Sequence, residues 1–282
     1  MLIMAARAAA IVIRPANSAW PNVTQHLRRL FEYGDLLRTL SIHRISVRYR
    51  QTFLGVAWAV VQPLLMMTVF ALVFSRMARI PSEGMPYALF AYTALLPWTF
   101  FSTAVTNATG SLVNHSSLIT KVYFPREILP ITYVVAGFFD FAIGLVALAG
   151  LMLWFEVPIT PAILYLLPVV ALLAAWILSV SLVVSAAQVR WRDVGVAMPV
   201  FVQILMFASP VIYPLAVVPE AWRPWYLLNP MAGIINAFRD VLLRAQFPDL
   251  LPLAYSAAVT ACALPLAYLL FKRAEATMAD IV

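Results

Sequence analysis

Six apolar stretches, each about 20 residues or longer and almost free of charged side chains, recur along the sequence. An α-helix needs about 20 predominantly apolar residues to cross the hydrocarbon core of a bilayer. The predicted spans are residues 54–75, 87–112, 128–154, 162–187, 194–213 and 251–271. This pattern predicts an all-α integral membrane protein with six transmembrane helices.

The amino-acid composition excludes a soluble globular protein. Of the 282 residues, 63% are hydrophobic and only 11% are charged, against about 25% charged in a typical soluble domain. A soluble protein of this size would have to build its own exterior from apolar side chains. We therefore expect residues 31–282 to form a single transmembrane domain, preceded by a cytoplasmic tail at residues 1–30.

The distribution of positive charge indicates how the spans are oriented. Of the 19 Lys and Arg residues, 14 would lie on the side that carries both termini and five on the opposite side. Because loops rich in Lys and Arg stay in the cytoplasm, both termini are predicted to be cytoplasmic. The net charge of +7 is thus a feature of membrane topology, and we expect no nucleic-acid partner.

The segment that leads into the first span, residues 31–50, is too rich in charge to cross the bilayer. On a helix, five of its apolar residues would share one stripe, namely Tyr33, Leu36, Leu37, Leu40 and Val47. This pattern favours an interfacial helix that lies in the plane of the lipid headgroups. The alternative is a simple cationic anchor for the first span.

Three arginines near the start of the first span, Arg44, Arg48 and Arg50, are candidates for binding lipid phosphate. Guanidinium groups pair bidentately with phosphate, and the pyrophosphate of a lipid carrier would need cations near the cytoplasmic leaflet. The same arginines suit anionic headgroups in general, so the type of phosphate stays open.

Three motifs resemble the permeases of bacterial type-2 ABC polysaccharide exporters, the family that serves O-antigen, teichoic acid and capsule export. They are RYRQTFLGVAWAVVQPLLMM at 48–67, KVYFPREILP at 121–130 and LLNPMAGIINAFRDVLL at 227–243. The resemblance implies a homodimer in the bacterial inner membrane, paired with two copies of a separate ATPase subunit. It also implies a lipid-linked polysaccharide substrate that moves outward from the cytoplasm.

The sequence agrees with a separate ATPase on one independent point. It contains no GxxxxGK[ST] loop, and its two lysines, Lys121 and Lys272, do not follow glycine. That loop is the element that cradles phosphates in ATP-binding proteins. We therefore expect no catalytic site and no cofactor in this chain, with ATP and Mg²⁺ bound by the partner.

The loop between the second and third spans is expected to be cytoplasmic, and the resemblance makes it the element that couples to the ATPase. The residues that would do so are Lys121, Tyr123, Phe124, Pro125, Arg126 and Glu127. An exposed Phe124 would be the anchor and the charges would form its rim. The alternative is an ordinary loop whose Tyr123 and Phe124 sit among lipid headgroups. If this loop couples to the ATPase, replacing Phe124 or Glu127 is expected to uncouple ATP hydrolysis from export.

The stretch 214–250 is apolar and yet interrupted by prolines. Irregular backbone at membrane depth is tolerated only where protein or water satisfies its polar groups. Residues 231–243 can form one helix, with Arg239 and Asp240 at an end near the outer surface. The resemblance implies a pair of short re-entrant helices between spans five and six, and the alternative is a periplasmic loop with one interfacial helix.

A polysaccharide path needs aromatic rings, against which the C–H faces of sugars pack. An ion path would instead need rings of charges or carbonyl groups. The candidate path residues are Tyr92, Trp98, Phe100, Phe101, Tyr133, Phe138, Phe139, Phe207 and Tyr213. For any one of them, lipid contact or helix packing is an alternative role.

Asp140 is the one acid well inside a predicted span, where an acid costs about 2.5–3.5 kcal/mol. It should face the bundle interior, where it would pair with an arginine, line the path, or make an interhelical hydrogen bond. Gly137 and Gly144 lie on one face of the same helix and would admit a close neighbour.

Two other functions fit part of the sequence. A small-molecule or drug permease of the same superfamily would also lack its own ATP site. An intramembrane enzyme that acts on a lipid-linked sugar would need an acid–base or metal constellation. Asp140 and Glu156 are a thin basis for such chemistry, and one cysteine with three scattered histidines predicts no metal site.

Overall fold

The computed structural model describes residues 32–50, 52–77, 82 and 84–281. The predicted cytoplasmic tail at residues 1–30 lies outside these described residues. Within them the secondary structure is helical, and no strand occurs in the described ranges. The fold class predicted from the sequence, all-α, is confirmed.

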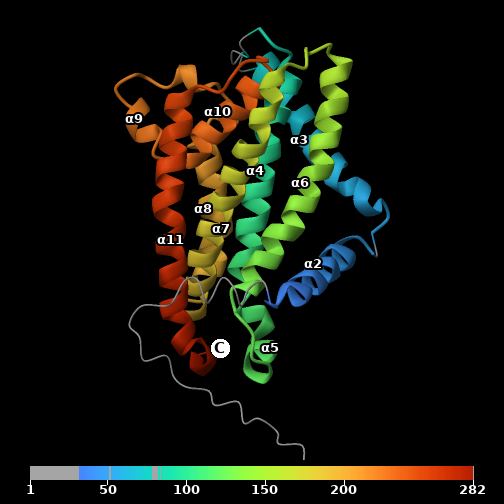
Figure 1. Ribbon diagram of the computed structural model, residues 1–282. Coiled ribbons are helices and arrows are strands. Elements are labelled where there is room, and N and C mark those ends of the chain that lie inside the picture. The colour runs from blue at the N-terminus through green and yellow to red at the C-terminus, as the bar shows by residue number, and fades with distance from the viewer. Residues whose placement is uncertain (1–31, 51, 78–81, 83, 282) are drawn as a thin grey trace, which may run out of the picture.

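The helices form an upright bundle with one helix lying across it (Figure 1). In chain order they are α2 (Gly34–Tyr49), α3 (Trp58–Phe70), α4 (Tyr87–Thr109), α5 (Ser116–Lys121), α6 (Ile128–Trp154), α7 (Leu166–Arg190), α8 (Val194–Phe207), α9 (Arg223–Tyr226), α10 (Pro230–Leu242) and α11 (Leu250–Ile281). α5 and the last turns of α11 mark one end of the bundle, the α5 end. α9 and α10 mark the opposite end, the α10 end.

Among the described residues, five stretches of helix are long and apolar enough to cross a membrane. They are Gly55–Ser75, Tyr87–Thr109, Ile128–Trp154, Pro161–Arg190 and Leu250–Met278, and they confirm five of the predicted spans. α8 has only 14 residues, about 21 Å of helix against a hydrocarbon core of about 30 Å. It ends just before Ser209 and Pro210, where proline cannot continue the hydrogen-bond ladder. The total of six spans therefore stays a prediction.

α4 is the central helix of the bundle. In its most apolar part 78% of the residues are buried, against 11% for Gly55–Ser75, and it contacts α3, α6, α7, α8 and α10. The close approach expected at the α6 glycines is confirmed. A Cβ on Gly144 would overlap Leu96, and one on Gly137 would lie 3.2 Å from the ring of Phe100. These glycines let α6 pack tightly against α4.

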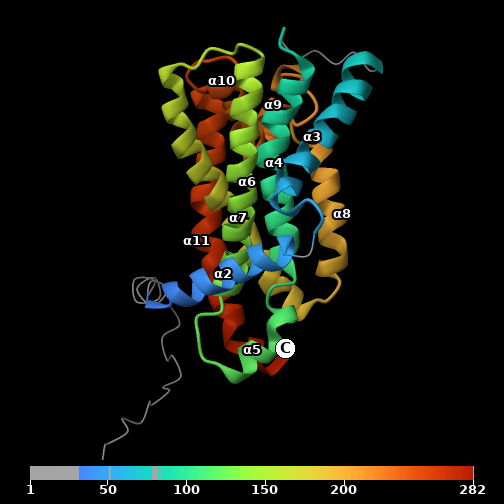
Figure 2. The same cartoon turned by 90° about the vertical axis from the view of Figure 1, so that its right-hand side faces the viewer.

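α2 lies across the bundle near the α5 end and packs against α6 (Figure 2). Of the predicted apolar stripe, Tyr33, Leu36, Leu37 and Leu40 pack against a buried cluster of this protein, whereas Val47 is 63% exposed. The N-terminal part of α2 is thus held by protein contacts. A helix in this segment agrees with the sequence, whereas its place in the plane of the lipid headgroups stays a prediction.

α10 is buried along its whole length at the α10 end. Its cap is Asn229, whose side chain accepts from Met231 N at 3.1 Å, as an N-cap asparagine does. Arg239 and Asp240, expected at a helix end near the outer surface, are each 1% exposed; their position near the outer face of the membrane stays a prediction. Arg239 donates to the carbonyl groups of residues 210, 211 and 213, and Asp240 accepts from Asn236 at 3.0 Å. Both Nη groups of Arg239 and both carboxylate oxygens of Asp240 have partners in the protein, and this pairing allows the two charges to be buried.

Two helices lie between α8 and α11, α9 with four residues and α10 with 13 residues. α9 and α10 both lie at the α10 end (Figure 1). Whether they re-enter the bilayer stays a prediction, as does their role at the outer mouth of the path.

Candidate functional site

The loop that follows α5 projects from the α5 end of the bundle (Figure 1). Val122 and Tyr123 are 52% and 73% exposed, whereas Phe124 is only 4% exposed and belongs to a buried cluster with Phe271 and Met278 of α11. The expectation of an exposed Phe124 anchor is therefore wrong. The exposed aromatic ring of this loop is Tyr123, and Phe124 fixes the loop from beneath.

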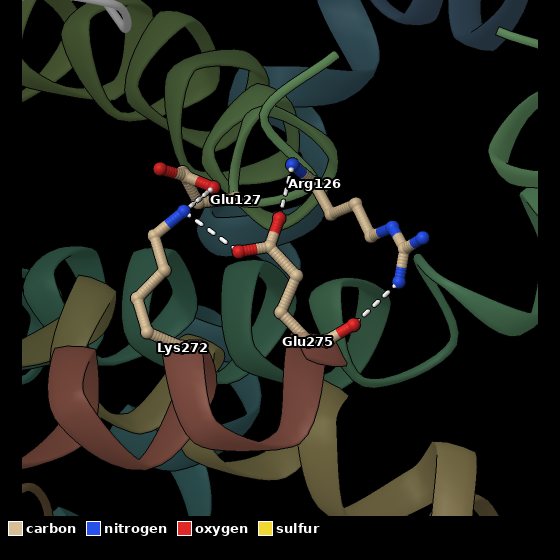
Figure 3. A network of polar contacts seen from close by, with 4 residues as sticks. All are labelled: Arg126, Glu127, Lys272 and Glu275. Carbon is tan, nitrogen blue, oxygen red and sulfur yellow. Dashed lines mark hydrogen bonds and ion pairs between the residues drawn. The ribbon is translucent and has the colours of Figure 1, made fainter. Parts of the chain in front are cut away.

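Four charged residues join this loop to α11 (Figure 3). Lys272 Nζ lies 2.7 Å from Glu127 Oε2 and 2.8 Å from Glu275 Oε2. Arg126 contributes twice: its backbone N–H donates to Glu275 Oε1 at 3.2 Å, and its guanidinium donates to the Glu275 carbonyl oxygen at 2.7 Å. Two positive and two negative side chains make the group electrically neutral. We call these four residues the latch.

Two members of the latch have buried side chains, which differs from the predicted rim of exposed charges. The side chains of Lys272 and Glu127 are 6% and 1% exposed. A buried ammonium or carboxylate is tolerated only where it is paired and hydrogen-bonded, and here the two buried charges of Lys272 and Glu127 pair with each other. Of the predicted coupling charges, Arg126 and Glu127 therefore face α11, while Lys121 is exposed.

Asp140 of α6 pairs with the C-terminal end of α2. It accepts from the guanidinium of Arg48 and from the hydroxyl of Tyr49. Of the roles the sequence left open for Asp140, pairing with an arginine is confirmed. Burial and the hydrogen bond to Asp140 raise the pKa of Tyr49 to about 12, so the hydroxyl keeps its proton and acts as a donor.

Two cavities meet at this pair. The larger, about 500 Å³, is lined by polar and aromatic side chains that include Gln62, Trp98, Thr99 and Phe100. The second, about 470 Å³, is lined by His43, Arg44, Asn107, His115 and Tyr133, among others. Both are also lined by Arg48, Thr103, Gly137 and Asp140. Volumes of this size match those of small-ligand pockets.

Arg44 projects from α2 against α6 in the second cavity. Its Nε donates to Thr132 Oγ1 at 2.7 Å, and its guanidinium carbon lies 3.5 Å from the ring centroid of Tyr133. Its Nη2 lies 3.4 Å from His115 Nε2. Burial lowers the pKa of the Arg44 guanidinium from its ordinary value, because a cation loses hydration there.

Burial also lowers the pKa of His115, and the charge of Arg44 lowers it further. The ring is therefore neutral at neutral pH.

The structure does not bring the predicted path aromatics together on one surface. Trp98, Phe100 and Tyr133 line the cavities. Tyr92 and Phe101, at 0% and 1% exposure, are packed in the core. Phe138 is 44% exposed, and its ring centroid lies 6.0 Å from that of Phe100. Phe139 and Phe207 are exposed, and the Tyr213 hydroxyl lies 3.1 Å from that of Tyr226 near α9.

The arginines predicted to bind lipid phosphate have separate environments. Arg48 is paired with Asp140, Arg44 lies in the second cavity, and Arg50 is exposed. Two residues of the site were not predicted, Lys272 and Glu275. The signal for them was an i,i+3 pair of opposite charges at the end of the last span, a spacing that places both side chains on one helix face.

Comparisons with known proteins agree with this architecture. The ABC-2 type transporter family matches residues 35–243. The O-antigen export system permease protein RfbA of Myxococcus xanthus is 31% identical over 260 residues, covering 91% of this chain and 98% of that protein. A protein of the same name from Klebsiella pneumoniae is 25% identical over 213 residues, covering 74% and 81%. The polysialic acid transport protein KpsM of Escherichia coli is 20% identical over 250 residues, covering 86% and 94%.

Proposed function

Because the chain belongs to the ABC-2 type transporter family, we propose that it is the membrane-spanning subunit of an ATP-driven exporter of a polysaccharide such as O-antigen. Membership of a family of transporter permeases excludes the alternative of an intramembrane enzyme. The observation that carries the choice of cargo is the likeness to an O-antigen export permease along nearly the whole chain. The relative named for polysialic acid transport points to the same class of cargo.

In this proposal the α5 end faces the cytoplasm of a bacterium and the α10 end faces outward. The excess of Lys and Arg expected on the side of the termini supports this orientation. Two copies of the chain would pair with two copies of an ATPase that binds ATP and Mg²⁺. The exposed faces of α3 and α8, with Leu65, Val69, Val200 and Ile204 each more than half exposed, are apolar surface for lipid or for the second copy.

The ATPase contact in this proposal is the loop after α5. Its exposed Val122 and Tyr123 form a small apolar tip, and aromatic side chains often anchor interfaces. The charged side chain of Lys121 is exposed beside them. The burial of Phe124 and the latch beneath hold this tip rigidly, so that a push on the tip reaches the helices.

The cargo path in this proposal includes the two cavities. Trp98, Phe100 and Tyr133 offer ring faces for sugar. Arg44 offers a cation to a phosphate of the lipid carrier, and its contacts at Thr132, His115 and Tyr133 are all with neutral groups. Arg50, which is exposed after α2, offers a second cation for this phosphate.

The experiment is complementation together with purification. A strain deleted for this chain should lose the polysaccharide from its surface and accumulate it inside, and the intact chain should restore export. The chain should also co-purify with an ATPase subunit whose hydrolysis it alters. Export of the polysaccharide unchanged in the deletion strain, with a small hydrophobic drug retained instead, would contradict the proposal and favour the drug permease.

A further inference from the structure

The latch joins segments that lie far apart in the sequence. Lys272 and Glu127 are separated by 145 positions, and Figure 3 shows the loop residues Arg126 and Glu127 directly facing Lys272 and Glu275 of α11. An ordinary surface loop contacts its neighbours through a few replaceable groups. Here the contact combines an ion pair, two main-chain hydrogen bonds and an apolar cluster.

The ion pair, the hydrogen bonds and the apolar cluster each restrain a different movement of the loop relative to α11. The pair between Lys272 and Glu127 resists separation, because parting would leave two desolvated charges. The hydrogen bonds of Arg126 to Glu275, one from its backbone and one to a backbone carbonyl, fix the register of loop and helix. Phe124 beneath them shares a buried cluster with Phe271 and Met278, so sliding would open a cavity.

The ammonium group of Lys272 also lies near an aromatic ring. Its Nζ lies 5.7 Å from the ring centroid of Tyr268, one turn earlier on α11, within the range of a cation–π contact. The lysine therefore has a single favoured position, determined by Tyr268, Glu127 and Glu275 together. A group held in this way acts as a fixed joint between two elements.

We infer that the end of α11, from Lys272 to Met278, and the loop from Lys121 to Glu127 form one rigid coupling unit, with Lys272 as its positioning residue. The inference rests on the proposed function, because it concerns how movement of the ATPase reaches the permease. A push on Tyr123 is delivered to the last span as well as to α6, which begins directly after Glu127. Lys272 touches neither ATP nor cargo and acts through the loop.

The inference predicts that tying the two segments together covalently leaves transport intact. In a Cys262→Ser background, Arg126→Cys and Glu275→Cys would be bridged by a short bismaleimide in inverted vesicles that contain the whole complex. This pair leaves Lys272 and Glu127 in place. Export driven by ATP should stay within about twofold of the unbridged double variant, with each single-cysteine variant as the control for the reagent.

Loss of export on bridging, with ATPase still bound, would overturn the inference, because the loop would then have to move relative to α11. The cysteine-free parent separates this outcome from failure of the proposed function. If the cysteine-free Cys262→Ser parent itself exports no polysaccharide in the presence of ATP, the proposed function fails. If the parent exports and only the bridged form does not, the rigid unit alone is wrong.

A second measurement tests the role of Lys272 as a positioning residue. With Lys272→Met we expect ATP hydrolysis to continue while export per ATP falls at least tenfold, and Lys272→Arg should restore most of it. A protein destabilised without any positioning defect would lose hydrolysis and export in the same proportion, and that result would overturn the assignment. If the Lys272→Met protein does not accumulate, the cross-linking experiment alone decides whether the loop and α11 form a rigid unit.

Discussion

The ammonium group of Lys272 lies 2.7 Å from a carboxylate oxygen of Glu127, and both side chains are buried where a loop meets the last helix of the bundle. Removing one member of such a pair is costly because the other is left as a buried, uncompensated charge. The same reasoning applies to the second carboxylate that Lys272 contacts, that of Glu275. The stability of this region therefore depends on one lysine.

We expect Lys272→Met to lower the free energy of unfolding by about 3–5 kcal/mol. Arg273→Met is the matched control, because it removes a positive charge from the adjacent, exposed position and should change stability by no more than about 0.5 kcal/mol. Denaturant titration of the purified protein in detergent measures both. Equal losses for the two variants would contradict the pairing.

Tyr123 and Phe124 should separate binding from stability. Phe124→Ala leaves a cavity in the cluster with Phe271 and should cost about 3–5 kcal/mol. Tyr123→Ala removes an exposed ring, so stability should change by about 0.5 kcal/mol or less, while affinity for the ATPase subunit falls. Thermal unfolding and co-purification measure the two effects, and a stable Phe124→Ala protein would argue against the buried position.

The contact between α10 and α11 depends on Gly233. A Cβ there would overlap the carbonyl oxygen of Pro252 and the hydroxyl of Ser256, and backbone cannot move aside easily. Gly233→Ala should therefore destabilise the protein by about 1–3 kcal/mol, the usual cost of overpacking. Gly150→Ala in α6 is the control, since nothing lies within 4 Å of its Cβ position, and it should change stability by about 1 kcal/mol or less.

The pair between Arg48 and Asp140 can be measured by a double-mutant cycle. The side chains are 38% and 22% exposed, so solvent screens the pair and the coupling energy should be on the order of 1 kcal/mol. The cycle uses Arg48→Met, Asp140→Asn and both together. Arg50→Met with Asp140→Asn should show no coupling, and additive effects of Arg48→Met and Asp140→Asn would count against the pair.

His115 should make stability depend on pH. Its pKa is lowered in the folded protein, so the unfolded chain takes up the proton first as the pH falls below about 6.5. The stabilising contribution of the neutral ring is complete above that pH and is lost progressively below it. Thermal unfolding at pH 7.5 and 5.5 measures the loss. His115→Gln should reduce this loss of stability, whereas His43→Gln, at an exposed position, should leave the loss unchanged.

The spans could be predicted because hydropathy is a local property of the sequence. Five long runs became helices of about the expected extent. The glycine pair on α6 correctly indicated a close neighbour, which the structure shows to be α4. The span predicted at 194–213 is only partly confirmed, because the helix ends at Phe207, before Ser209 and Pro210. Hydropathy counts these residues as part of an apolar run, while backbone hydrogen bonding does not tolerate the proline.

The site was harder to predict because its contacts join distant segments. The sequence indicates that an acid at position 140 needs a partner, but only the fold shows that the partner is Arg48 of α2. A loop with Tyr123 next to Phe124 does not indicate which ring faces outward. Packing against α11 decides which ring is buried, because its Phe271 and Met278 cover Phe124. No local sequence pattern contains this information.

The latch also determines when during synthesis the protein becomes complete. At about 5–20 residues per second, the 145 positions between Glu127 and Lys272 correspond to roughly 7 to 30 seconds of translation. Throughout that interval the carboxylate of Glu127 has been made and its ammonium partner has not. If the loop docks the ATPase as proposed, a nascent chain cannot present it in finished form, and engagement of the ATPase would wait until the last helix has been inserted.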